Sequence, residues 1–127
     1  MLADSPIHPV LLATDLEAAR EFYHVKLGLP ILVERRDEAI EFSCGQGTKL
    51  AVTKSTTGTA DSQSQAGWTV DDLEATLAEL RERGVKIEDY DLPGLRTEGG
   101  IADFGFARMA FFVDPGGNAL AILQQSD

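Results

Sequence analysis

Few residues of this sequence have side chains suited to chemistry, and His8 is the first of them. An imidazole titrates near neutral pH, so His8 could act as a general base or touch a ligand. It could equally be a structural polar residue whose hydrogen bonds are made within the fold. Cys44 has no histidine obviously placed to activate it, so we interpret it as a small buried hydrophobe. If the chain is an enzyme, His8 is the candidate catalytic residue.

Three charged residues in the second half could meet a ligand. Arg108 begins a predicted strand and is the best candidate for binding an anionic group. Glu98 and Asp103 lie on a long loop and could meet a cationic group, although acids on a loop are more commonly only solvated. Gln65 begins another predicted strand, and a buried amide there must find hydrogen-bond partners.

The elements that position these residues come in two copies. The tetrapeptide DLEA at residues 15–18 recurs at residues 72–75, 57 positions later. Each copy follows a short apolar segment and opens a helical pattern that ends at glycine, Gly28 or Gly84. Two copies indicate a duplicated supersecondary unit, because a solenoid would need at least three.

Each copy predicts one strand, one helix and three further strands. In the first module, at about residues 5–54, apolar runs predict strands at 7–13, 31–35, 40–44 and 50–54. In the second, at about residues 65–125, they predict strands at 65–70, 85–90, 108–113 and 119–124, with a helix at 72–83. Small polar residues at 55–64 predict a linker. The long loop 91–107 carries Phe104 and Phe106, so part of it should pack.

Length and charge narrow the function classes. A chain of 127 residues fits one compact domain that needs no disulfide or metal to fold. Its formal net charge of −10, without a basic stripe, argues against a nucleic-acid partner. One cysteine, no signal-like start and no long apolar run indicate a cytoplasmic protein with no membrane partner.

The sequence resembles the vicinal-oxygen-chelate superfamily, which includes glyoxalases, extradiol dioxygenases and bleomycin-resistance proteins. Three groups of segments carry the resemblance. They are HPV at 8–10 with DLE at 15–17, FY at 22–23 and LGL at 27–29; VDDL at 70–73 with GV at 84–85; and FFVDPGGN at 111–118. The resemblance implies an α+β fold in which two βαβββ modules form one cup-shaped domain.

In metal-dependent members of this superfamily, ligands project into the cup from the first and last strands of both modules. The resemblance places these positions on His8, Ala51, Gln65 and Ala121. One imidazole and one amide are too few for a catalytic divalent ion, which takes about three protein ligands. We therefore expect no metal and no cofactor.

Successive residues of a strand point to opposite faces of the sheet, and this alternation predicts which residues face a ligand. Small side chains leave room in the cup, and an apolar lining with few polar groups is typical of a small-molecule site. The predicted ligand contacts are His8, Val10, Leu12, Ala51, Thr53, Gln65, Thr69, Phe104, Phe106, Arg108 and Ala121. Loop 91–107 could instead fold in and fill the cup.

The leading hypothesis is a homodimeric, metal-independent protein that holds a largely apolar or aromatic small molecule, comparable to the bleomycin-resistance branch. The alternative is an enzyme of the superfamily, a lyase, isomerase or dioxygenase, with an atypical site built on His8 and Arg108. A third hypothesis is a module with a filled cup that serves to pair with another protein.

Overall fold

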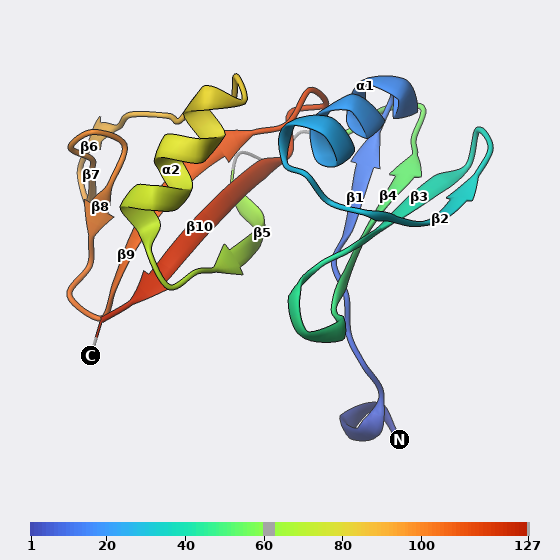
Figure 1. Cartoon of the computed structure of the whole chain (residues 1–127), viewed down its shortest axis with the longest axis horizontal. Coiled ribbons are helices and arrows are strands. Elements are labelled where there is room, and N and C mark those ends of the chain that lie inside the picture. Colours follow the sequence, from blue (N-terminus) through green and yellow to red (C-terminus); the bar gives the residue numbers. More distant parts are fainter. Residues whose placement is uncertain (60–62, 127) are drawn as a thin grey trace. The chain divides into compact units, whose positions relative to one another are not determined.

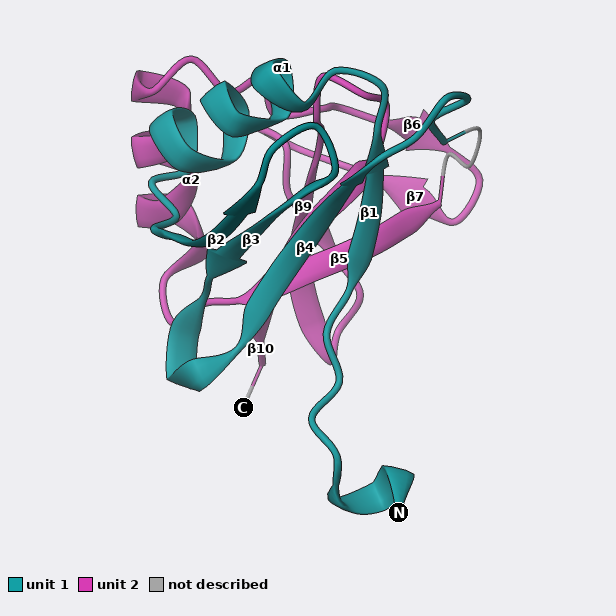
Figure 2. Ribbon diagram, turned by 90° about the vertical axis from the view of Figure 1, so that its right-hand side faces the viewer, with its two compact units in different colours: residues 1–59 teal, residues 60–127 magenta. Residues whose placement is uncertain are grey.

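The computed structural model of the chain describes residues 1–59 and 63–126. The structure forms two compact units, residues 1–59 and residues 60–127 (Figure 2). Of the predicted linker 55–64, residues 60–62 lie outside the described residues, and Ser64 already belongs to a strand. Both units have an α+β fold, and each contains most of the elements predicted for one module (Figure 1).

The first unit contains one four-stranded sheet covered by a helix. Its strand order is β1-β4-β3-β2, with β1 parallel to β4 and the other pairs antiparallel. The elements are η1 (Leu2–Asp4), β1 (Val10–Ala13), α1 (Leu16–Arg20), η2 (Glu21–Lys26), β2 (Ile31–Arg35), β3 (Ala39–Ser43), η3 (Gly45–Gly47) and β4 (Lys49–Lys54).

The helix of the first unit begins and ends as the sequence predicts. The carboxylate of Asp15 accepts a hydrogen bond from the backbone N–H of Ala18 at 3.1 Å, which caps the helix. The helix widens into π-helical turns over Glu21–Lys26 and ends at Gly28, whose φ is +74°. These turns bury Tyr23 completely, and its ring packs on Phe42 of the sheet at a centroid distance of 5.4 Å.

The second unit repeats this arrangement around helix α2. Its strand order is β5-β10-β9-β8, with β5 parallel to β10 and the other pairs antiparallel. The elements are β5 (Ser64–Thr69), α2 (Leu73–Glu82), β6 (Asp91–Leu92), β7 (Leu95–Arg96), β8 (Ala102–Asp103), β9 (Ala107–Val113) and β10 (Ala119–Gln125). Asp72 caps α2 through the N–H of Ala75, which confirms the predicted helix start.

The core of the second unit lies between α2 and one face of the sheet. Leu73, Leu77 and Leu80 of the helix are buried, as their spacing predicts. Trp68 stacks on the buried Phe112 with ring centroids 6.1 Å apart, and its register partner Ile122 is also buried, so Trp68 lies on the helix-facing side of the sheet.

One predicted strand of this unit is wrong. Residues 85–90 form no strand, and the edge position beside β9 belongs to β8. Val85 and Ile87 are buried, so their alternation correctly reported burial. Only one backbone bond joins this segment to β9, from the N–H of Glu88 to the carbonyl of Phe111 at 2.8 Å. Alternating burial therefore did not entail strand pairing.

Candidate functional site

Each sheet has one face covered by its helix and one open face. On the first sheet, the register pairs Val10 with Ala51 and Leu12 with Thr53, so these four residues share the open face. Leu11, Leu50 and Val52 occupy the other face and are buried. This confirms the predicted alternation. Val10 and Leu12 remain 53% and 37% exposed, which leaves an apolar strip on this face.

A charged network lies beside this strip. The register places Glu41 opposite Ala51, and its carboxylate accepts hydrogen bonds from Arg35 at 2.7 Å and Lys49 at 2.9 Å. The hydrogen bonds from Lys49 and Arg35 hold the pKa of Glu41 below its usual range. The structure places Glu41 on the open face, with its charge compensated.

His8 lies just before β1 and is exposed. The predicted strand at 7–13 is therefore shorter than expected. The backbone ladder reaches only as far as Pro9, whose carbonyl accepts from the N–H of Ala51 at 3.1 Å. The only histidine on this strand segment is thus next to the sheet and not within it.

Gln65 has a structural partner at each end of its amide. Its Nε2 donates to Oδ1 of Asn118 at 3.0 Å, and its Oε1 accepts from the backbone N–H of Ala119 at 3.1 Å. Asn118 is fully buried and also donates to Asp114 at 2.7 Å. Gln65 therefore fastens β5 to the turn between β9 and β10.

The open face of the second sheet is apolar. Register places Gly67 beside Ala121 and Thr69 beside Leu123 on this face. Phe111 and Met109 lie opposite Ala121 and Leu123 on the neighbouring strand, and so belong to the same face.

A groove of about 600 Å³ opens on this face within the second unit. Its walls come from β9, β10, the strand start at β5 and the loop that carries β6, β7 and Phe104. Tyr90 of this loop packs edge-on against Phe111, with ring centroids 5.8 Å apart. The lining residues are Gln63, Ser64, Tyr90, Leu92, Gly94, Leu95, Phe104, Met109, Phe111, Phe112, Ala119 and Leu120.

The groove includes only one of the predicted ligand contacts, Phe104. Phe106 is 69% exposed and lies beside Phe104 without lining the groove. Thr69 and Ala121 share the open face but also lie outside the lining.

Arg108 lies on the opposite side of the sheet from the groove. Its guanidinium makes two hydrogen bonds of 2.8 Å to the carboxylate of Glu74 on α2, and one of 3.1 Å to Gln124. These bonds from Arg108 lower the pKa of Glu74, and the same pair raises that of Arg108. The expectation that Arg108 faces the open side is corrected. The side chain of Arg108 lies on the helix side of the sheet because the carboxylate of Glu74 pairs with it there.

The four positions that the resemblance assigns to metal ligands do not offer a suitable donor set. Ala51 and Ala121 have no donor atom, and Gln65 uses both ends of its amide within the fold. Across residues 1–59 and 63–126, no three His, Cys, Asp or Glu side chains are grouped so that they could hold a metal ion. The residues present thus do not fit the metal centre of the metal-dependent members.

Sequence reasoning missed most of the groove. Met109 and Phe111 lie in a run that is apolar on both faces, so alternation could not separate the open side from the core. Tyr90, Leu92 and Leu95 sit in the segment expected to be a strand and a loop. Loop 91–107 was expected to pack in part, and Phe104 does so along the groove. In the described part of the chain, no helix has the length and apolarity to span a membrane.

Comparison with solved structures shows the fold. A glyoxalase family protein from Bacillus anthracis aligns with a TM-score of 0.75 at 16% identity, over 97% of this chain and 96% of that one. Lactoylglutathione lyase from Agrobacterium tumefaciens aligns with a TM-score of 0.71 at 17% identity, over 95% and 93%.

A third structure is more similar in sequence. TnmS3, an antibiotic binding protein from Streptomyces sp. CB03234, aligns with a TM-score of 0.75 at 26% identity, over 99% of this chain and 100% of that one. No curated protein sequence gives a significant match. The family model described as Glyoxalase/Bleomycin resistance protein/Dioxygenase superfamily matches residues 5–122. The chain therefore belongs to the glyoxalase/bleomycin resistance protein/dioxygenase superfamily.

Proposed function

We propose that this protein binds a small, largely apolar or aromatic molecule and that it does so without a metal ion. The observation that carries the proposal is the groove on the open face of the second sheet. Four aromatic residues, Tyr90, Phe104, Phe111 and Phe112, line it together with Met109. An apolar lining with few polar groups is typical of small-molecule sites.

The physical basis of this binding is removal of apolar surface from water. Aromatic walls offer large contact areas and favour edge or offset packing against a ligand ring. Met109 has an unbranched, polarizable side chain that adapts to an irregular ligand. Ala119 leaves volume on the floor of the groove. The full-length similarity to an antibiotic binding protein supports a role in sequestration.

The other predicted contacts remain part of the proposal. On the first sheet these are Val10, Leu12, Ala51 and Thr53, with His8 next to them; on the second they are Thr69 and Ala121. We further expect a homodimer in the cytoplasm. The net charge of −10 argues against a nucleic-acid partner and favours a ligand that is neutral or cationic.

Fluorescence titration with Nile red, an uncharged apolar dye, tests the groove. Phe104→Ala removes a half-exposed ring from the wall, so we expect at least fivefold weaker dye binding. Val25→Ala is the control, because Val25 is an exposed apolar residue on η2 outside the groove. Equal affinity of wild type and Phe104→Ala would contradict the proposed site.

Calorimetry with chelator-treated protein tests the metal-independent part. Ni²⁺, Zn²⁺, Mn²⁺ and Fe²⁺ are titrated into wild type and His8→Ala. We expect no specific binding, since the residues at the four family positions supply too few donors. Micromolar binding that disappears in His8→Ala would overturn this part and would favour the metalloenzyme alternative.

A further inference from the structure

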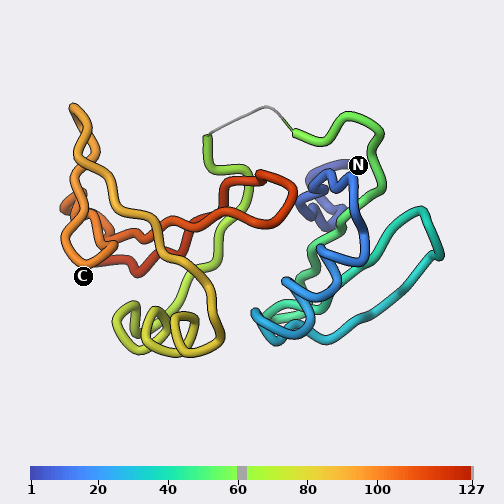
Figure 3. Tube along the Cα trace, turned by 90° about the horizontal axis from the view of Figure 1, so that it is seen from above, coloured from blue at the N-terminus to red at the C-terminus, as the bar shows by residue number. Residues whose placement is uncertain are grey.

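The hairpin formed by β6 and β7 has no counterpart in the first unit. It spans Asp91–Leu92 and Leu95–Arg96, joined by a turn with Gly94 at a φ of +79°. It pairs only with itself and forms a separate two-stranded sheet. The trace in Figure 3 follows it in orange as a projecting loop of its unit. A two-stranded hairpin alone is only marginally stable, so something must hold this one.

A hydrogen-bond clamp fixes the root of the hairpin. The hydroxyl of Thr97 donates to the carboxylate of Asp89 at 2.7 Å and accepts from the backbone N–H of Tyr90 at 2.8 Å. The same Asp89 oxygen accepts from the N–H of Gly100 at 2.9 Å. The bonds from Thr97 and Gly100 lower the pKa of Asp89, so the carboxylate is ionised at neutral pH. Both strands of the root are thereby tied to one carboxylate.

The root is also tied to helix α2. Arg81 donates from its guanidinium to the carbonyl of Gly99 at 2.9 Å. Gly100 is buried with a φ of +85°, and a Cβ there would lie 2.6 Å from Cγ2 of Ile87. The backbone at this point is therefore packed directly against the buried Ile87.

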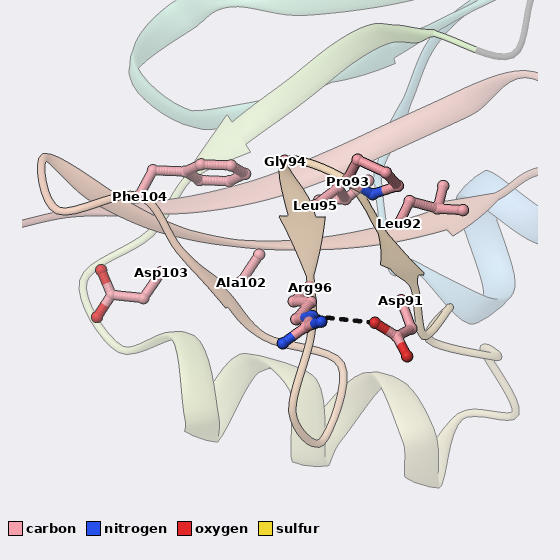
Figure 4. A pocket seen from close by; sticks show the side chains of 9 residues that line it. All are labelled: Asp91, Leu92, Pro93, Gly94, Leu95, Arg96, Ala102, Asp103 and Phe104. Carbon is pink, nitrogen blue, oxygen red and sulfur yellow. Dashed lines mark hydrogen bonds and ion pairs between the residues drawn. The ribbon is translucent and has the colours of Figure 1, made fainter.

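The tip of the hairpin presents apolar side chains to solvent. Leu92 is 54% exposed and Leu95 is partly exposed. Both residues line the groove described above, and both also line a second groove of about 670 Å³, which includes Ala102 and Asp103 of β8. Phe104 is shared in the same way. In the view of Figure 4, Phe104 lies level with the tip, and the Arg96–Asp91 ion pair lies toward the root.

We propose that this hairpin is a preorganised jaw of the ligand site, in which Leu92 and Leu95 contact the ligand and determine which ligands fit. Thr97 and Asp89 are positioning residues that hold the jaw against the groove. The inference rests on the proposed function, because it assigns a specificity element to the same site. A wall that is fixed before binding loses little conformational freedom when the ligand enters, which favours affinity.

Leu92→Ser tests the jaw, with Leu32→Ser as the matched control. Both leucines are 54% exposed, so neither substitution removes a buried core residue, but only Leu92 lines the groove. We expect Nile red to bind Leu92→Ser about fivefold more weakly and to bind Leu32→Ser like wild type. Unchanged affinity of Leu92→Ser, with wild type binding normally, would refute the jaw alone. Absence of dye binding to wild type would remove the proposed site and the jaw with it.

The clamp is tested by a pair of substitutions at one position. Thr97→Val removes the hydroxyl that links Asp89 to Tyr90, and Thr97→Ser retains it. We expect Thr97→Val to weaken dye binding several-fold and to speed amide hydrogen exchange at residues 91–96. Thr97→Ser should match wild type in both measurements. Faster exchange without a change in affinity would show that the clamp serves stability only, and would overturn the positioning role.

Discussion

Gln65 offers the sharpest test of how this chain uses a position that the family gives to a metal ligand. The substitution Gln65→Ala removes two hydrogen bonds, the 3.0 Å bond to Asn118 and the 3.1 Å bond from Ala119. Each such bond contributes a net of about 0.5–1.5 kcal/mol, so the expected loss is about 1–3 kcal/mol. For a chain of this size, a loss of about 2 kcal/mol lowers the Tm by roughly 8 °C.

Thermal denaturation followed by circular dichroism measures this loss. Gln125→Ala is the matched control, because Gln125 is exposed at the end of β10 and should give a Tm close to that of wild type. A structural role for Gln65 predicts a lower Tm and, as for wild type, no specific metal binding. If Gln65→Ala keeps the wild-type Tm but loses ligand or metal binding, the structural interpretation is refuted.

Gln65→Glu adds a test whose sign depends on pH. One oxygen of the introduced carboxyl can still accept from Ala119, but the other would face the acceptor oxygen of Asn118. Ionisation is thus disfavoured in the folded state, which raises the folded-state pKa above the unfolded value of about 4.3. A raised pKa gives stability that is present at low pH and lost as the pH rises through the folded value. The gap in Tm between the variant and wild type should therefore narrow from pH 7 toward pH 4.

Three further outcomes follow from the geometry. Gly100→Ala should be more destabilising than Gly99→Ala in urea denaturation, since both have positive φ but only the Cβ at 100 would lie 2.6 Å from a methyl carbon of the neighbouring isoleucine. Arg108 lowers the pKa of Glu74 in the folded state below its usual value of 4.5, so the pair stabilises the fold at a pH above 4.5. This contribution disappears as the pH falls through the pKa of the folded state. The Tm difference between wild type and Glu74→Gln should therefore shrink on acidification. Asp72→Ala should cost about 1 kcal/mol through loss of the helix cap, and Asp72→Asn much less, as read from denaturant midpoints.

Much of the fold could be predicted from local signals. Asp15 and Asp72 cap the helices, and Gly28 takes the positive φ that ends the first of them, because these roles depend on chemistry within a few residues. Open-face residues were predicted where apolar and polar side chains alternate, as in β1 and β4.

The predictions that were wrong concern features that depend on contacts between residues far apart in the sequence. The segment 85–90 alternates like a strand, but β8 from beyond the hairpin takes the edge position. Arg108 was expected to face a ligand, and its direction was decided by Glu74, 34 residues earlier. The groove was missed because residues 109–113 are all apolar, so period-two alternation gives no sign of the open side.

The strand order has a consequence for how the chain folds. In each module the first strand pairs with the last, as β1 does with β4 and β5 with β10, while every strand pair of the described residues stays within one module. The sheet of the first module therefore needs no residue beyond 54, and it can close during synthesis before the second module has left the ribosome. Closure of each sheet brings together strands about 40 to 55 positions apart, so this loop closure should limit the folding rate.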